Sequence, residues 1–197
     1  MAIIVQKLTS PVGDLLLAAS PAGIVAVEFM DGSFDEARAN LRQRLNCDVT
    51  RGEHPLLGLL TGQLDAYFLG ELQQFSVPFD IRGTAFQQSV WKRLTEIPYG
   101  ETRSYLDIAK AIGNPKSGRA VGLANGANRI AIVIPCHRVI NTGGGLGGYG
   151  GGLDRKRFLL QLEAGRSESP LVSANSSTRA FSYGPADVSS RQPQRSK

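Results

Sequence analysis

The 197-residue sequence contains little cysteine and little histidine: Cys47, Cys136, His54 and His137 are the full set. Two cysteines are too few for a disulfide framework, so we expect a reducing, cytoplasmic location. No CxxC or HxxxH pair is present, and we therefore expect no metal. Apolar runs of about 20 residues, which a membrane span needs, are also missing. The N-terminus has neither the basic region nor the cleavage site of a secretory signal.

Acidic and basic residues are unevenly divided along the chain. Residues 1–81 carry 5 Lys+Arg and 10 Asp+Glu, residues 82–165 carry 12 and 5, and residues 166–197 carry 5 and 2. The net charges are therefore −5, +7 and +3, which sum to +5. A basic segment joined to an acidic one is typical of a protein with one face for a polyanion, and nucleic acid is the obvious candidate. Solvated surface charge without a partner is the alternative at this point.

The first part of the chain predicts a small antiparallel sheet with helices. Three short apolar runs in the first thirty residues are separated by turn residues, a pattern typical of a meander. Apolar spacing predicts helices over 34–45 and 56–69. We place a domain boundary near residue 82, which gives an acidic α/β domain over 1–81. Residues 166–197 are rich in Ser, Pro, Arg and Gln, and we interpret them as a disordered tail.

Residues 82–165 predict a mostly helical second domain. Thr84-x-x-Gln87 and Ser104-x-x-Asp107 are capping boxes, each at the start of an apolar stripe. A further short helix is expected from about Ser117 to Asn125, closed by Gly126. The two helices after Ser104 resemble a helix-turn-helix. The fold class is therefore α/β of the α+β kind, with a small N-terminal sheet followed by a helical, winged-helix-like domain.

The segment 118–126 is unusual for a helix because it holds three glycines and two alanines. Each glycine costs a helix about 1 kcal/mol relative to alanine. Small residues permit a close approach to another surface, either a packed helix or a nucleic-acid backbone or groove. Arg119 is the single long cation in this segment, which favours nucleic acid.

The candidate reactive group is Cys136. The β-branched run 130–134 predicts a buried strand, and Pro135-Cys136-His137-Arg138 follows it. We expect the cationic neighbours to lower the pKa of the thiol. Adjacent residues of an extended segment point to opposite sides, so His137 would act on Cys136 through a water molecule. Glu163, in a helix predicted over 153–164, is the natural carboxylate to orient the imidazole. An inert buried cysteine is the alternative reading.

Residues 134–140, with the sequence Ile-Pro-Cys-His-Arg-Val-Ile, resemble the active-site signature of the O6-alkylguanine-DNA alkyltransferases, or methylated-DNA–protein-cysteine methyltransferases. The resemblance covers about residues 84–165 strongly and 1–83 loosely. The other matching positions are Arg119-Ala120-Val121-Gly122, Asn125-Gly126, Asn128, Gly148-Tyr149, Gly151-Gly152-Leu153 and Leu159-Leu160-x-x-Glu163.

The resemblance implies a DNA repair protein that transfers an alkyl group from guanine oxygen-6 irreversibly to its own cysteine, once per molecule. This single-turnover methyltransferase needs no cofactor. By similarity, Cys136 is the nucleophile, His137 is its base through water, Glu163 orients His137, and Asn128 positions the loop at the cysteine.

The substrate contacts are also implied by the resemblance. Tyr105 would donate to a ring nitrogen of the departing guanine, and Tyr149 belongs to the loop that closes over the base. The backbones of Val139 and Gly150 would contact the purine edge, because glycine allows the main chain to approach a flat ring.

The DNA contacts follow in the same way. Arg119 would enter the duplex and fill the gap left by the flipped nucleotide, while Ala120 and Gly122 line a helix in the minor groove. Ser104 is a further expected DNA contact. The expected partner is double-stranded DNA containing O6-alkylguanine, with O4-alkylthymine as a further candidate, bound by a monomer with strong salt dependence.

Two positions depart from the family pattern: Arg129 stands where Pro is common, and Gly150 stands where some relatives have Ser. Three other functions fit the sequence less well. An alkylated-DNA-binding protein without transfer activity would lack the reactive Cys136. A cysteine hydrolase leaves the basic helix pair without a role. A helix-turn-helix transcription factor would need base-reading side chains, which 118–126 lacks.

Overall fold

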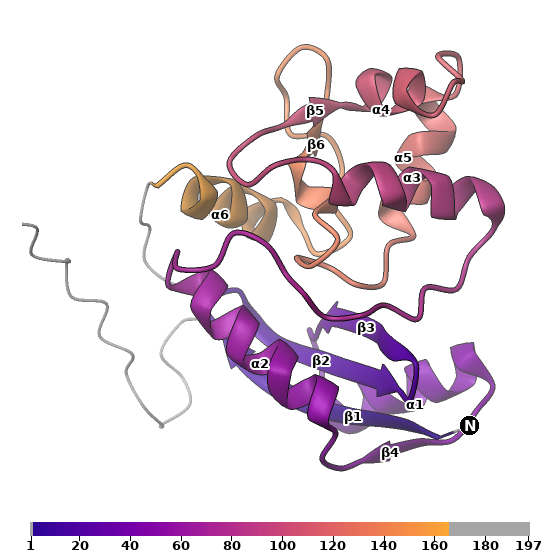
Figure 1. Cartoon of the computed structure of the whole chain (residues 1–197), viewed down its shortest axis with the longest axis vertical. Coiled ribbons are helices and arrows are strands. Elements are labelled where there is room, and N and C mark those ends of the chain that lie inside the picture. Colours follow the sequence, from indigo (N-terminus) through magenta and orange to yellow (C-terminus); the bar gives the residue numbers. More distant parts are fainter. Residues whose placement is uncertain (1, 166–197) are drawn as a thin grey trace, which may run out of the picture.

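The structure is a computed structural model that describes residues 2–165, so the expected tail at 166–197 lies outside the described residues. Figure 1 shows a sheet flanked by helices in the N-terminal half and a mostly helical C-terminal half above it. Within residues 2–165, no helix has the length and apolar character needed to cross a bilayer.

The N-terminal half confirms the predicted meander and both predicted helices. Its elements are β1 (Ile3–Ser10), β2 (Gly13–Ser20), β3 (Gly23–Phe29), α1 (Phe34–Leu45), β4 (Val49–Arg51) and α2 (Pro55–Phe68). The strand order is β3-β2-β1-β4, in which β4 pairs parallel to β1 and the other neighbours are antiparallel.

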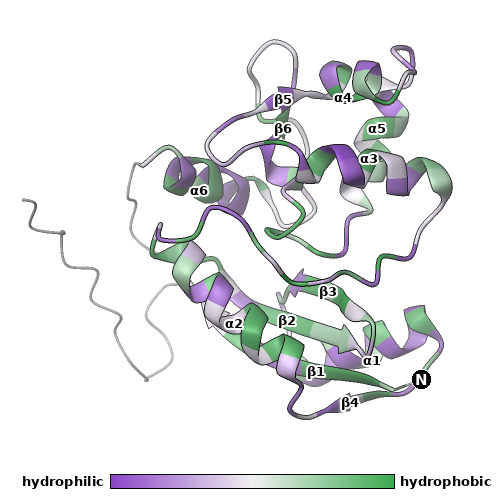
Figure 2. Cartoon of the chain, viewed as in Figure 1, coloured by the Kyte–Doolittle hydropathy of each residue, from purple (hydrophilic) through white to green (hydrophobic). Residues whose placement is uncertain are grey.

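The sheet is covered on both faces, which explains why β2 is apolar at consecutive positions. Leu16 and Ala18 face a small cluster with α1, whereas Leu15 and Leu17 belong to a larger core. That larger core also contains the buried face of α2 and most of the buried residues of the C-terminal half. Figure 2 shows the hydrophobic colouring along β1, β2 and parts of α2. One continuous core therefore joins the two halves of the chain.

The C-terminal half contains the predicted capped helices. Its elements are α3 (Ala85–Thr95), β5 (Arg103–Ser104), α4 (Tyr105–Ala111), α5 (Gly118–Gly126), a 3₁₀ helix (Cys136–Arg138), β6 (Val139–Ile140) and α6 (Leu153–Glu163). Both capping boxes form, at Thr84 and at Ser104. Gly113 follows α4 with φ of +75°, a conformation that glycine adopts without steric cost, and the chain then turns into α5. The helix-turn-helix and the α+β class are therefore confirmed.

The strand predicted over 130–134 is wrong. Ile130 makes an isolated bridge with Val27, and the following residues form a tight turn. The Val133 N–H donates to the Ala131 carbonyl, the Ile134 N–H donates to the Ile130 carbonyl, and Ile132 has φ of +70°. The whole segment is buried, and a fully buried turn has the same unbroken apolar pattern as a buried strand. Cys136 therefore opens a 3₁₀ helix instead of following a strand.

The open edge of β3 anchors the two segments that lead to the C-terminal half. The Ile24 N–H donates to the Pro78 carbonyl at 2.8 Å, and the Asp80 N–H donates to the Ile24 carbonyl at 2.9 Å. Further along, the Val27 N–H donates to the Arg129 carbonyl at 2.8 Å. The edge of the N-terminal sheet is thereby covered, and it holds the loop that precedes Cys136.

Gly23 provides a test of this covered edge. A Cβ at Gly23 would lie 2.7 Å from the carbonyl carbon of Phe79 in the crossing segment, so Gly23→Ala should force the two backbones apart. We expect the free energy of unfolding to fall by about 1–3 kcal/mol in denaturant titrations. Gly62→Ala is the matched control, because it lies within α2 with open space around it, and it should stabilise the chain by about 0.5–1 kcal/mol. Equal effects of the two substitutions would contradict this account.

Candidate active site

A cleft with a volume of about 630 Å³ lies over Cys136. Its lining residues come from both halves of the chain. They are Val27, Glu28, Phe29 and Asp31 from the N-terminal half, and Tyr105, Gly118, Arg119, Gly122, Asn125, Gly126, Asn128, Arg129, Ala131, Cys136, Gly148, Tyr149, Gly150 and Gly151 from the C-terminal half. Cys136 is only 5% exposed, so its sulfur lies at the base of the cleft.

Asn128 holds the turn before Cys136 in shape. Its side-chain amide donates to the Ile134 carbonyl at 2.9 Å and contacts the Cys136 Sγ at 3.1 Å, while its Oδ1 accepts the Ile130 N–H at 3.0 Å. Asn125, on α5, donates to the Cys136 carbonyl at 3.2 Å. These hydrogen bonds, instead of the strand pairing that the sequence predicted, hold the turn together. They also fix the position of the Cys136 sulfur relative to α5.

Burial raises the pKa of the Cys136 thiol, and the hydrogen bond from Asn128 and the positive charge of Lys156 only partly oppose this. The expected lowering of the pKa of this thiol is therefore wrong. The physical reason is that Arg138, expected as a cationic neighbour, turns away from the sulfur. Its guanidinium donates to Glu163 and to the Ile97 carbonyl instead.

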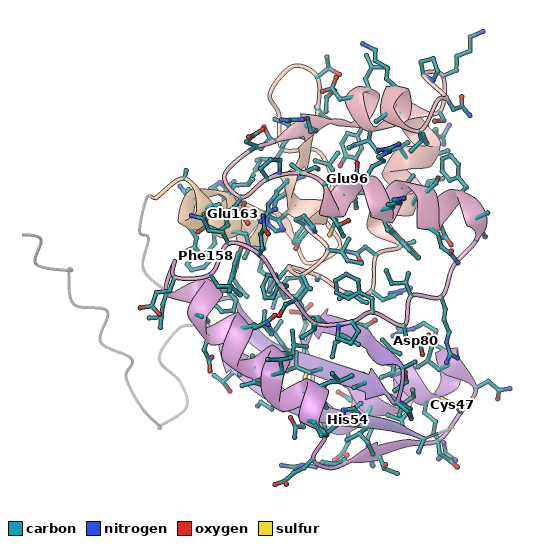
Figure 3. The ribbon with its side chains drawn as sticks, in the orientation of Figure 1. Cys47, His54, Asp80, Glu96, Phe158 and Glu163 are labelled. Atoms are coloured by element: carbon teal, nitrogen blue, oxygen red, sulfur yellow. The ribbon has the colours of Figure 1, made fainter. Side chains whose placement is uncertain are left out.

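Glu163 is the centre of a buried polar network, and it lies on α6 beside the end of α2 (Figure 3). Its Oε1 interacts with His137 Nε2 at 2.8 Å and accepts from the Tyr67 hydroxyl at 2.7 Å. Arg138 donates to both carboxylate oxygens, at 2.8 and 2.9 Å, and the Gly100 N–H donates to Oε2 at 3.2 Å. Burial alone would raise the pKa of Glu163, but His137 and Arg138 outweigh it and hold the pKa at about 2.

His137 has no solvent exposure, and burial lowers its pKa despite the adjacent Glu163. A neutral imidazole donates through Nε2 to the carboxylate, which leaves Nδ1 with a lone pair. Nδ1 is buried and has no hydrogen-bond partner within residues 2–165. No hydrogen bond joins His137 to Cys136 within the same residues, in keeping with the expectation that the two do not meet directly.

Lys156 is a site residue that sequence reasoning missed. It has no solvent exposure, and its ammonium donates to the carbonyls of Val139, Leu146 and Gly148. Burial lowers its pKa to about 8, against the attraction of Cys136. In the sequence, Lys156 stands between two arginines, and a lysine in such a run is usually solvated. One signal did indicate that Lys156 is buried: Leu159 and Glu163 follow it by three and seven positions, so the three residues share one helix face.

Of the four residues expected to contact the guanine base, Tyr105, Tyr149 and Gly150 line the cleft, and Val139 does not. Tyr105, half-buried, donates to the Gly148 carbonyl at 3.4 Å, and both residues line the cleft with Gly150. Burial and the nearby Cys136 charge raise the pKa of Tyr149 well above its usual value. Val139 does not line the cleft: it is buried, and its carbonyl accepts from Lys156 at 2.6 Å.

Helix α5 has one packed face and one exposed face. Val121 and Ala124 are buried, and the Ala124 carbonyl accepts from the Trp91 indole at 2.8 Å. Arg119 and Ala120 are exposed, and within residues 2–165 Arg119 makes no hydrogen bond or ion pair. A Cβ at Gly122 would lie 3.8 Å from the ring of Tyr105.

Ser104 does not join this exposed face. Its side chain is the N-cap of α4: the hydroxyl accepts the Asp107 N–H at 3.1 Å and donates to the Asp107 carboxylate at 2.7 Å. Ser104 is also only 9% exposed. Both its donor and its acceptor capacity therefore serve the helix-turn-helix itself.

The N-terminal half supplies a wall of the cleft that the sequence did not indicate. Arg155, on α6, donates to the Val12 carbonyl at 2.8 Å, to the Gly151 carbonyl at 3.1 Å and to Asp31 at 2.7 Å. Its guanidinium also lies 4.9 Å from the ring centroid of Phe29. A Cβ at Gly151 would lie 2.5 Å from the same ring, so only glycine permits this approach.

The two matching family models together cover nearly all of the described residues. The family model for the DNA-binding domain of 6-O-methylguanine DNA methyltransferase matches residues 85–165. The model for the ribonuclease-like domain of the same family matches residues 3–81. The methylated-DNA–protein-cysteine methyltransferase of Mycobacterium bovis is 47% identical over 170 residues, which are 85% of this chain and 96% of that protein. The protein of the same name from Methanosarcina acetivorans is 50% identical over 155 residues, 78% of this chain and 94% of that protein.

Solved structures agree. The crystal structure of Mycobacterium tuberculosis OGT in complex with DNA has a TM-score of 0.73 and 45% identity, and the match covers 87% of this chain and 98% of that one. The O6-methylguanine-DNA methyltransferase of Pyrococcus kodakaraensis has a TM-score of 0.56 at 29% identity, covering 82% of this chain and 98% of that one. Sequence, fold and the surroundings of Cys136 lead to the same conclusion: this chain belongs to the 6-O-methylguanine DNA methyltransferase family.

Proposed function

We propose that this chain repairs DNA by moving an alkyl group from oxygen-6 of guanine to the Sγ of Cys136, once per molecule. The observation that carries the proposal is the buried sulfur of Cys136 at the base of a cleft. The small residues of α5 line one side of this cleft. Family membership supports transfer over binding alone, because the nucleophile of the signature is present. The lining of the cleft by glycines and two tyrosines suits a flat aromatic base.

The reaction is a displacement at a saturated carbon. The sulfur of Cys136 attacks the alkyl carbon, a carbon–sulfur bond forms, and the bond from that carbon to guanine oxygen-6 breaks with its electrons going to the guanine. The thiol proton passes to His137 through water, and the departing guanine gains a proton at a ring nitrogen from Tyr105. Solvent then carries the imidazolium proton back to the Tyr105 phenolate, so both side chains end in their neutral forms. The products are a thioether on the protein and an unmodified guanine.

The raised pKa of Cys136 makes a base necessary, because the thiol is protonated near neutral pH. The buried Nδ1 of neutral His137 suits that role, and Glu163 keeps the imidazole in the required tautomer. Lys156 favours the thiolate once it forms, since its positive charge lies close enough to lower the pKa of the thiol. The sulfur therefore depends on His137 to become a nucleophile.

The substrate base must leave the duplex to reach this sulfur. Extruding a nucleotide costs a few kcal/mol, and less for a damaged pair. Arg119 is long, exposed and at the rim of the cleft, which suits a side chain that fills the vacated position. The smooth face around Ala120 and Gly122 suits the narrow minor groove. The net charge of +7 over residues 82–165 supplies the attraction to phosphates.

We further propose that residues 82–165 form the DNA-binding and alkyl-transfer domain, as the sequence indicated, and that residues 1–81 add one wall of the cleft. The chain acts as a monomer, and neither metal nor cofactor has a role in the displacement. Double-stranded DNA with O6-alkylguanine is the proposed partner.

The proposed transfer predicts a mass change at one residue. Mixing the chain with duplex DNA containing O6-methylguanine should add one methyl group to the peptide that carries Cys136, and repair should stop at one equivalent. Cys136→Ala should bind the same DNA without repairing it, whereas Cys47→Ala should repair at the native rate. Repeated turnover, or methylation at another residue, would contradict the proposal.

Arg119 should matter only for substrate in a duplex. Because its proposed role is to stabilise the extruded state, Arg119→Ala should slow methyl transfer from duplex DNA by about 10- to 100-fold. Transfer from the free O6-methylguanine base should stay at the native rate. Arg93→Ala, which removes an exposed cation of α3 paired with Glu96, is the control, and with DNA at saturating concentration it should leave both rates unchanged. Equal loss with duplex and free base would refute the assigned role.

Lys156 should hold the glycine-rich loop at the cleft. Lys156→Met removes the donor shared by three loop and strand carbonyls, so amide hydrogen exchange should accelerate across residues 146–151. We expect transfer from DNA to slow by about tenfold or more, as loss of a charge-assisted bond of about 1.5–3 kcal/mol implies. Arg157→Met, at the next position of α6 but exposed, is the control. Unchanged exchange in the Lys156 variant would count against this role.

A further inference from the structure

Tyr67 connects the N-terminal half to the catalytic network. It lies in the last turn of α2, has no solvent exposure, and donates its hydroxyl to Glu163 Oε1 at 2.7 Å across 96 positions of sequence. Burial raises the pKa of Tyr67 well above its usual value, and the negative charge of Glu163 raises it further. The hydroxyl therefore stays protonated and remains a donor at all physiological pH values.

Tyr67 and His137 share one oxygen atom. Glu163 Oε1 receives the Tyr67 hydroxyl at 2.7 Å, His137 Nε2 at 2.8 Å and Arg138 Nη2 at 2.9 Å. Each donor to a carboxylate oxygen disperses part of its negative charge, and less charge remains to stabilise an imidazolium. A third donor on Oε1 thus weakens the pull of Glu163 on the imidazole proton.

The tyrosine ring would fill its place in the core without the hydroxyl. The ring packs against Phe68, Phe75 and Tyr99, with centroid separations of 5.4, 5.5 and 6.0 Å. A buried hydroxyl is costly unless it is hydrogen-bonded, so phenylalanine would suit a purely packing role at least as well. The polar group at this position is therefore explained by its bond to Glu163.

We propose that Tyr67 is a positioning residue for alkyl transfer: through Glu163 Oε1 its hydroxyl sets the basicity and orientation of the His137 imidazole. The inference rests on the proposed function, because it takes His137 as the base for Cys136. It adds an active part for the N-terminal half, which otherwise contributes only a wall of the cleft.

Other ionisable groups also face the His137–Glu163 pair, and they fix the background against which Tyr67 acts. The positive charges of Arg138 and Lys156 lower the pKa of His137, as burial does, whereas Glu163 raises it. Tyr99 lies close enough to Glu163 for the carboxylate to raise its pKa, after burial. Within residues 2–165, these groups are Tyr67 on α2, Tyr99 after α3, Arg138 on the 3₁₀ helix, Tyr149 in the loop before α6, and Lys156 on α6.

The first test is the pH dependence of methyl transfer in Tyr67→Phe. Without the hydroxyl, Glu163 holds the imidazole proton more strongly, so the pKa of His137 rises and the neutral base is lost at a higher pH. The acid limb of the rate constant for O6-methylguanine DNA should move upward by about 0.5–1 pH unit. The rate ratio of native to variant chain should therefore be several-fold larger at low pH than at high pH.

Tyr99→Phe is the matched control. Tyr99 belongs to the same aromatic cluster, but its hydroxyl is 3.5 Å from the Leu162 carbonyl and does not bond to Glu163. The acid limb of the pH–rate profile of Tyr99→Phe should coincide with that of the native chain. A Tyr67→Phe rate ratio that is constant with pH, or a shift equal to that of Tyr99→Phe, would overturn the inference and leave Tyr67 as a packing residue.

A second substitution keeps the test decisive if Tyr67→Phe does not fold. Site-specific 3-fluorotyrosine at position 67 retains ring and hydroxyl but makes the hydroxyl a stronger donor. The acid limb should then move downward, opposite to the effect of phenylalanine, and an upward or absent shift would overturn the inference.

A measurement on the imidazole itself separates this inference from the proposed function. The chain has two histidines, His54 and His137, so an NMR titration distinguishes them readily. In a Cys136→Ala background, which cannot transfer, Tyr67→Phe should still raise the pKa of His137. Failure of the native chain to methylate itself would refute the function alone, whereas an unchanged His137 pKa would refute the role of Tyr67.

Discussion

The arrangement of the active site depends on the hydrogen bonds to the buried carboxylate of Glu163. An ionised carboxylate inside a protein is costly, and here five hydrogen bonds from four residues offset that cost. The donors come from α2, from the turn at Gly100 and from the 3₁₀ helix that contains the nucleophile. A single anion therefore joins the N-terminal half to the turn at Cys136 and fixes the orientation of His137. It also neutralises Arg138, whose charge would otherwise be buried without a partner.

Burial controls the chemistry as well as the packing. It raises the pKa of the Cys136 thiol and lowers those of His137 and Lys156, so it favours the neutral form of each group. In the proposed mechanism, proton transfer to the neutral imidazole of His137 creates the thiolate beside the positive charge of Lys156. Because burial raises the pKa of the thiol, Cys136 is not ionised without the help of a base.

Much of the fold and part of the site could be predicted from the sequence. The capping boxes at Thr84 and Ser104 and the glycine after α4 are local signals, and each produced the expected structure. The run 130–134 was predicted as a strand but forms a turn. A turn that is fully buried is apolar at every position, so its sequence pattern does not differ from that of a buried strand. Lys156 was missed because a lysine in a basic run resembles a solvated residue, and the wall at Phe29 was missed because it depends on contacts between distant segments.

The sequence by itself determined the local elements, the charge division between the halves and the family to which the signature around Cys136 belongs. These depend on neighbouring residues and on short spacings, which are visible without coordinates. Only the tertiary structure decided which donors meet at Glu163, which face of α5 stays exposed and in which direction the pKa of the thiol moves. Those outcomes depend on burial and on pairs up to 96 positions apart, and no local pattern encodes them.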